Sequence, residues 1–183
     1  GEELKTDITI KIAGEAGQGL QTMGQLAAKS LSRSGLNVFA NQTLQSRIRG
    51  GHNCFQIRIC DAQVLAPSHT TDILVALDND SSCHIPELKK DSILIFDSSS
   101  VKIRVDKGIS LDLALEKIAK ESAGNKLMAN TVAVGAVLGL LERDINILFD
   151  LIREGFGLKS RDIAELNIKA AQAGYDKAYK KIP

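Results

Sequence analysis

Two glycine-containing segments carry the residue types best suited to binding chemistry. The first runs Gly14-Glu15-Ala16-Gly17-Gln18-Gly19, between a predicted strand and a predicted helix. Glycine permits positive φ and close approach of the backbone, and a helix that starts here points free N–H groups outward. A phosphate fits such a turn, although the glycines depart from the GxGxxG order and no Walker Gly-Lys-Ser/Thr follows. A tight packing turn without a ligand is the alternative interpretation.

The second segment, Ser46-Arg47-Ile48-Arg49-Gly50-Gly51-His52-Asn53, places two guanidinium groups and two glycines before a strand. Arginine offers a rigid fork of donors that matches phosphates and carboxylates, and the glycine pair lets the loop bend sharply. This pattern indicates an anion or an acidic partner surface, while a solvated surface loop is the alternative. The predicted cofactor-binding residues in the two segments are Gly14, Gly17, Gln18, Gly19, Arg47, Arg49, Gly50, Gly51 and Asn53.

Other reactive residue types lack the spacing that catalysis or metal binding requires. His52, His69 and His84 form no HxxxH or HExxH pattern, and no GxSxG elbow is present. The 3 cysteines show no CxxC spacing, so this chain alone cannot supply the four thiolates of an ordinary iron–sulfur cluster. We therefore predict no catalytic and no metal-binding residue in this chain.

Length and composition predict one soluble domain, residues 1–183. The chain of 183 residues is 44% hydrophobic and 25% charged, and its formal charge of +1 gives no reason to expect nucleic acid as a partner. No apolar run approaches the roughly 18 residues of a membrane span. Because the N-terminus, Gly1 to Lys5, is charged and lacks the apolar region of a secretory signal, we predict a cytoplasmic location.

The hydrophobic periodicity alternates between strand and helix along the first two thirds of the chain. Asp7 to Ala13, Leu36 to Ala40 and Asn53 to Cys60 read as strands, with a helix from Leu20 to Gly35 that completes a right-handed βαβ unit. Other expected features are a polar loop at 41–48, a hairpin turn at 61–63 leading to 64–65, parallel central strands at 73–77 and 93–96, and a further strand at 101–105.

The C-terminal third reads as helical. The predicted helices cover 111–122, 131–141, 145–154 and 161–179, with Asn130 and Ser160 as N-caps. Gly135 and Gly139 lie four residues apart, so one helix face can take another backbone at close range. The predicted fold class is α/β: a single three-layer Rossmann-like domain with a mostly parallel sheet, a β-hairpin and a helical C-terminal third.

Taken in order, the motifs resemble the gamma subunit family of 2-oxoacid:ferredoxin oxidoreductases. The resemblance rests on Ile10 to Gly19, Ser46 to Asn53, Ile73 to Leu77, Glu87 to Asp97, and Asn130 to Gly139 with the helices after it. The stretch from Arg47 to Asn53 is most similar to the variant in which the gamma domain precedes the alpha domain in one chain. A separate subunit and an excised domain both remain open.

The resemblance implies a component of an enzyme that converts a 2-oxoacid, coenzyme A and oxidised ferredoxin to acyl-CoA, carbon dioxide and reduced ferredoxin. In that family thiamine diphosphate and Mg²⁺ lie between the alpha and beta components, which are the expected partners, and [4Fe-4S] clusters lie on beta or delta. This chain alone holds no cofactor, and its two segments would face the shared active site. Which 2-oxoacid is used stays open.

Two other functions are compatible with the residues. A free-standing Rossmann-like nucleotide-binding protein is the first, but no acidic residue follows the strand at 36–40, where a ribose-binding carboxylate is expected. A purely structural scaffold is the second.

Overall fold

The computed structural model describes residues 7–15, 19–45, 52–60, 69–156, 160–179 and 181. Their contacts define two compact units. A sheet unit lies within residues 1–18 and 35–112, and a helical unit lies within residues 19–34 and 113–183.

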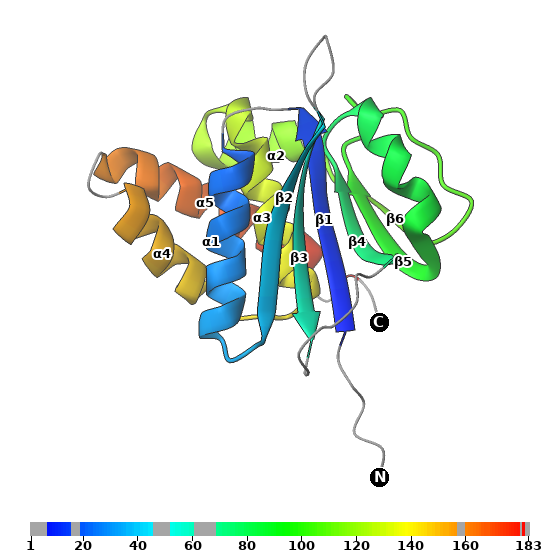
Figure 1. Cartoon of the computed structure of the whole chain (residues 1–183). Helices are drawn as coiled ribbons and strands as arrows, with labels where there is room; N and C mark the ends of the chain where they lie inside the picture. Colours follow the sequence, from blue (N-terminus) through cyan, green and yellow to red (C-terminus); the bar gives the residue numbers. More distant parts are fainter. Residues whose placement is uncertain are drawn as a thin grey trace. The chain divides into compact units, whose positions relative to one another are not determined.

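The sheet unit is a mixed six-stranded sheet with the order β2-β3-β1-β4-β5-β6 (Figure 1). Its strands are β1 (Asp7–Glu15), β2 (Val38–Gln45), β3 (His52–Cys60), β4 (Thr71–Ala76), β5 (Leu88–Phe96) and β6 (Ile109–Asp112). β1, β4, β5 and β6 pair in parallel, whereas β3 pairs antiparallel with both β1 and β2. The predicted α/β fold with a mostly parallel sheet is thereby confirmed.

Period-2 alternation decides which side chains enter the core. On one face of the sheet Ile10 lies between Ile57 of β3 and Ile73 of β4, and each is buried. On the other face a core cluster comprises Ala13, Cys54, Leu74, Ala76, Leu88 and Leu94. Ile85, from the 3₁₀ helix η1 (Asn79–Glu87), packs against this cluster, and so do Ile103 and Val105.

One local prediction for β2 in the sheet unit is wrong. Residues 41–45 continue β2 instead of forming a loop, because backbone pairing with β3 extends to Gln45 despite the polar side chains. β1 and β2 both pair antiparallel with β3 and therefore run parallel to each other, as the predicted βαβ unit requires, although β3 lies between them. The antiparallel hairpin partners observed are β2 and β3; the turn predicted at 61–63 and residues 64–65 lie outside the described residues.

The strand predicted at 101–105 is wrong, although the side chains of this segment alternate between buried and exposed. Val101 is buried, and Ile103 and Val105 pack against the core cluster, while Lys102 and Arg104 are exposed. The strand comes later, as β6, and takes residues 111–112 from the predicted helix at 111–122. Alternation of side chains with a period of two indicates that one side of a segment is buried. A strand also requires backbone hydrogen bonds to a neighbouring strand.

The helical unit contains α1 (Leu20–Arg33), α2 (Leu115–Ala123), the 3₁₀ turn η2 (Lys126–Met128), α3 (Ala129–Leu140), α4 (Asn146–Phe156) and α5 (Arg161–Ala178) (Figure 1). The helical C-terminal third is confirmed. Ser160 caps α5 as predicted, by accepting a hydrogen bond from the N–H of Ile163. Asn130 is not an N-cap, because α3 already begins at Ala129.

α3 and α5 run parallel and approach closely through glycine. A Cβ added at Gly135 would collide with the carbonyl of Ala171, and one at Gly174 with the carbonyl of Val132. At Gly139 the added Cβ would lie 2.6 Å from the carbonyl oxygen of Tyr175. The close approach predicted from the spacing of Gly135 and Gly139 is confirmed. None of the described helices is long and apolar enough to span a membrane.

Candidate functional site

The two glycine-containing segments leave the sheet from neighbouring positions. Gly14 near the end of β1 is the register partner of Asn53 near the start of β3, and Glu15 pairs with His52. A Cβ at Gly14 would lie 3.0 Å from Cβ of Leu77, so this position tolerates little beyond glycine. The end of β1 and the start of β3 therefore lie side by side at the same end of the paired strands.

Two buried oxygen atoms at this end of the strands have no hydrogen-bond donor among the described residues. Asn53 is only 6% exposed, and its Oδ1 has no hydrogen-bond partner within the described residues. Asp78, just past β4, accepts hydrogen bonds at Oδ1 from the N–H and hydroxyl of Ser81, while its Oδ2 has no partner among those residues. The Ser81 hydroxyl also lies 2.9 Å from the Ala13 carbonyl oxygen and donates its one proton to either acceptor in turn.

Gly19 starts α1 with features that suit an anion. Its φ of 94° is in the left-handed region, which favours glycine, and an added Cβ would meet nothing within 4 Å. Within the described residues, the N-cap Gly19 makes no side-chain capping bond and the first turn holds no acidic residue. The N–H groups of a first turn and the positive end of the helix dipole suit an anionic group.

Only part of the predicted site falls in the described chain. Gly14, Gly19 and Asn53 are described, and the first and last lie side by side. The predicted residues outside the described ranges are Gly17, Gln18, Arg47, Arg49, Gly50 and Gly51.

A polar cluster across β1 and η1 was missed by the sequence interpretation. Glu87 Oε2 accepts hydrogen bonds from Lys11 Nζ at 2.7 Å and from Thr71 Oγ1 at 2.9 Å, and His84 Nδ1 lies 3.5 Å from Oε1. Burial works to raise the pKa of Glu87, but the hydrogen bonds from Lys11 and Thr71 outweigh it, so the net shift is downward. In the sequence, only Lys11 indicated this polar cluster, because it is a charged residue inside a core strand.

Cys54 lies close to this cluster but is poorly suited to nucleophilic chemistry. Burial raises the pKa of its thiol to about 11, against a smaller opposing effect of Lys11. Because the thiolate is the reactive form, Cys54 serves packing in the core cluster.

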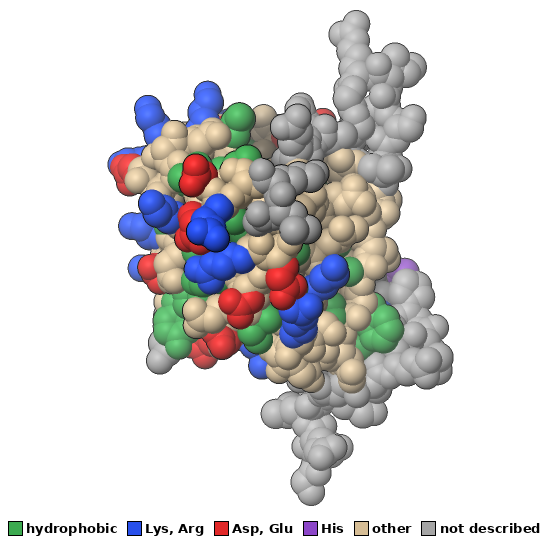
Figure 2. All heavy atoms as spheres, turned by 90° about the vertical axis from the view of Figure 1, so that its left-hand side faces the viewer, with side chains coloured by type: hydrophobic (Ala, Val, Ile, Leu, Met, Phe, Trp, Pro, Cys, Tyr) green, Lys and Arg blue, Asp and Glu red, His purple; other side chains and the backbone are tan. Residues whose placement is uncertain are grey.

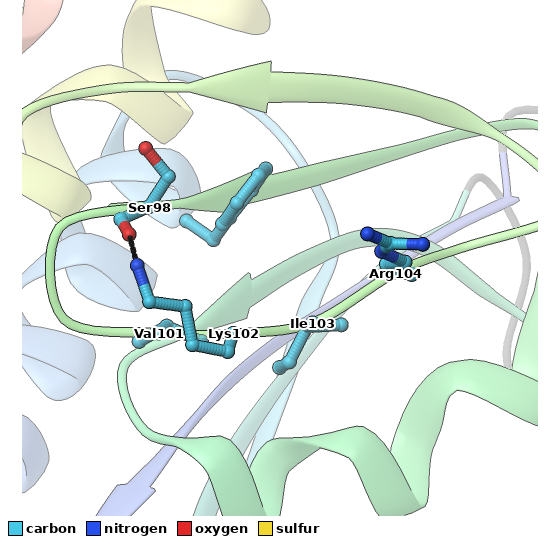
Figure 3. Close-up of a pocket in the computed structure, with 6 residues that line it drawn as sticks. Ser98, Val101, Lys102, Ile103 and Arg104 are labelled. Atoms are coloured by element: carbon cyan, nitrogen blue, oxygen red, sulfur yellow. Dashed lines mark hydrogen bonds between the residues drawn. The ribbon is translucent and has the colours of Figure 1, made fainter.

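A shallow hollow of about 470 Å³ lies at the end of β5 (Figure 3). Phe96, Val101 and Ile103 give it an apolar lining, and Ser98, Lys102 and Arg104 complete the wall. Lys102 Nζ donates to the carbonyl of Ser98, the bond drawn in Figure 3, which holds the ammonium beside the backbone. The hollow lies away from both predicted segments in sequence and contains none of the predicted residues.

The surface seen in Figure 2 mixes charges of both signs. Among the ion pairs of the described residues, Arg153 contacts both Asp150 and Glu165, and Arg33 lies 3.8 Å from Glu154. Within the described ranges, no group of three or more His, Cys, Asp and Glu side chains could hold a metal ion.

The fold and the edge site define an α/β module built on a mixed sheet, with helices in its C-terminal part. The family model for pyruvate ferredoxin/flavodoxin oxidoreductase matches residues 9–177. The chain belongs to this family, and the gamma-type resemblance found in the sequence is confirmed.

Three relatives illustrate the match. The 2-oxoglutarate synthase subunit KorC of Archaeoglobus fulgidus is 28% identical, over 94% of this chain and 89% of its own length. A keto/oxoacid ferredoxin oxidoreductase gamma subunit from Geobacter sulfurreducens is 26% identical with a TM-score of 0.78, covering 94% of this chain and 97% of that one.

The third is 2-oxoglutarate:ferredoxin oxidoreductase from Magnetococcus marinus, solved with 2-oxoglutarate, coenzyme A and succinyl-CoA bound. It has a TM-score of 0.83 at 24% identity and shows the fold alone. This chain is 94% covered in that comparison but spans only 31% of the Magnetococcus chain. The same fold thus occurs both in chains of similar length and as part of a longer one.

Proposed function

We propose that this chain is the gamma component of a thiamine-diphosphate-dependent 2-oxoacid:ferredoxin oxidoreductase. The complete enzyme would convert a 2-oxoacid, coenzyme A and oxidised ferredoxin to acyl-CoA, carbon dioxide and reduced ferredoxin. Thiamine diphosphate, Mg²⁺ and the [4Fe-4S] clusters belong to the other components in this proposal. In the cytoplasm, this chain packs beside the active site of the alpha and beta components. It binds and orients the ligand and shields the active site, and it does not itself react.

One observation carries the proposed position of the site. Because Gly14 and Asn53 are register partners, the predicted residues that follow Gly14 in the sequence and those that precede Asn53 are joined to the same end of two paired strands. A ligand or subunit at that end can meet both segments at once.

Coenzyme A is the ligand that this chemistry fits best. Its phosphates suit the glycine-rich sequence from Gly14 to Gly19 and the guanidinium groups of Arg47 and Arg49. Gly50 and Gly51 would let the loop follow the ligand closely. Coenzyme A also carries amide N–H groups that can donate to Asn53 Oδ1, which has no partner within the described residues.

The test is the double variant Arg47→Ala/Arg49→Ala in the complex assembled with alpha and beta components. Each lost arginine–phosphate contact should weaken coenzyme A binding roughly tenfold, measured by isothermal titration calorimetry. Subunit association, measured by sedimentation, reports whether the loop clamps a partner protein instead.

Arg104→Ala is the matched control, because Arg104 is an exposed arginine in the same unit but outside both segments. Arg104→Ala should change neither coenzyme A affinity nor subunit association. If the double variant also leaves coenzyme A affinity and subunit association unaltered, the assignment of this edge is wrong.

A further inference from the structure

β2 is an edge strand without the usual protection against pairing. It is eight residues long, pairs with β3 in unbroken register from Val38 to Gln45, and has no second neighbour in the described sheet. Its sequence, VFANQTLQ, contains no charge and no proline. Natural sheets usually blunt a free edge with lysine, proline, a bulge or a very short strand.

The opposite edge of the same sheet follows that usual rule. β6 is only four residues long and ends in a charged residue, Asp112, which accepts a hydrogen bond from the N–H of Ser98. The contrast marks β2 as the edge that is built to receive another strand.

The backbone groups on the open side of β2 can be assigned. The N–H of Cys60 donates to the carbonyl of Asn37, its directly opposed residue, so this is a hydrogen-bonded pair. Such pairs alternate along an antiparallel ladder, so Phe39, Asn41 and Thr43 also bond to β3. Val38, Ala40 and Gln42 therefore point their N–H and C=O groups outward.

The side chains near this edge are accessible. Phe39 is 48% exposed, and Ala40, Asn41 and Thr43 are also exposed. A half-exposed phenylalanine beside a row of outward-pointing backbone groups combines an apolar anchor with a template for strand addition.

We propose that β2 pairs antiparallel with β2 of a second copy of this chain, about a two-fold axis at Asn41. In this register Ala40 of one copy exchanges backbone hydrogen bonds with Gln42 of the other. Phe39 lies opposite Thr43 in both halves of the interface, at non-hydrogen-bonded positions, where side chains come closest. Aromatic and β-branched residues are a favourable cross-strand pair.

The absence of charge argues for a second copy as the occupant. Any charged residue at the axis would face its own copy, and like charges directly opposed are destabilising. Asn41 instead faces Asn41, and an amide both donates and accepts. An interface of two strands is small, so the association is reversible and concentration-dependent.

Sedimentation of the 183-residue chain over a range of concentrations tests the pairing. The expected result is a monomer–dimer equilibrium. Asn41→Lys and Asn41→Asp should each weaken it roughly tenfold, because two like charges then meet across the axis. Mixing the two variants should restore the dimer, which also shows that both remain folded.

Ser82→Lys is the control, since Ser82 is exposed on η1 and should leave the dimer intact. A chain that stays monomeric throughout would overturn the proposal, as would an Asn41→Lys chain that dimerises normally. Failure of the mixed variants to pair would rule out the register centred on Asn41. Loss of alpha and beta binding in Asn41→Lys, without any self-association of the parent chain, would assign this edge to another subunit.

Discussion

At the residue scale, the site at Gly14 and Asn53 contains hydrogen-bond acceptors, whereas its sequence motifs indicate donors. The sequence directs attention to donors: arginine side chains and the free N–H groups of a glycine turn. The structure adds two acceptors without donors in the described chain, Asn53 Oδ1 and Asp78 Oδ2. A buried polar atom without a partner costs about 1–3 kcal/mol, so it is retained where it serves another purpose.

Asn53 and Asn167 form a matched pair for testing this cost. Both are buried, but Asn167 accepts from the Thr131 hydroxyl and donates to the carbonyl of Ile163, each at 2.9 Å. We expect Asn167→Ala to lower the free energy of unfolding by about 1–3 kcal/mol more than Asn53→Ala does, because only Asn167 loses satisfied hydrogen bonds. Urea denaturation of the two variants measures the difference. Equal losses would show that Asn53 has a partner after all.

At the element scale, the segments with strong hydrophobic patterns were predictable from sequence. β1, β4, α1 and α5 follow from their periodicity, since burial on one face or on both leaves a local signature. The polar second half of β2 and the placement of β3 between β1 and β2 were not predictable, because they depend on pairing with residues far away in sequence. The strand predicted at 101–105 is wrong for the converse reason. Its side chains alternate and are buried on one side, yet its backbone pairs with no strand.

The candidate site was predictable in part for the same reason. Glycines and arginines mark Gly14, Gly19 and the loop before Asn53 locally, but the pairing of Gly14 with Asn53 emerges only from the sheet. The cluster of Glu87, Lys11 and Thr71 gave almost no local signal, because its members are as many as 76 residues apart.

The parallel pair of α3 and α5 depends on glycine at the contact. Gly174→Ala should lower the free energy of unfolding by about 3 kcal/mol, because the new methyl group would collide with the carbonyl of Val132 and part the helices. Gly155→Ala is the control: a Cβ there meets nothing within 4 Å, and alanine favours a helix over glycine by up to about 1 kcal/mol. Thermal denaturation compares them. Similar stability of both variants would refute the close packing.

At the scale of the whole molecule, the described part of the chain presents groups that suit binding. The described residues include no metal-binding cluster, Cys54 is buried with a raised pKa, and the edge at Gly14 and Asn53 carries glycine and polar groups. Membership in the pyruvate ferredoxin/flavodoxin oxidoreductase family supplies the larger setting in which such a module works. The proposed role is therefore to complete an active site whose reacting groups lie on other components.

The most direct test of this role is ferredoxin reduction by alpha and beta components, with and without this chain. With a 2-oxoacid and coenzyme A supplied, we expect the rate to rise with added chain and to saturate at equal molar amounts of the components. Ferredoxin reduction that proceeds equally well without the chain would contradict the assignment as a gamma component.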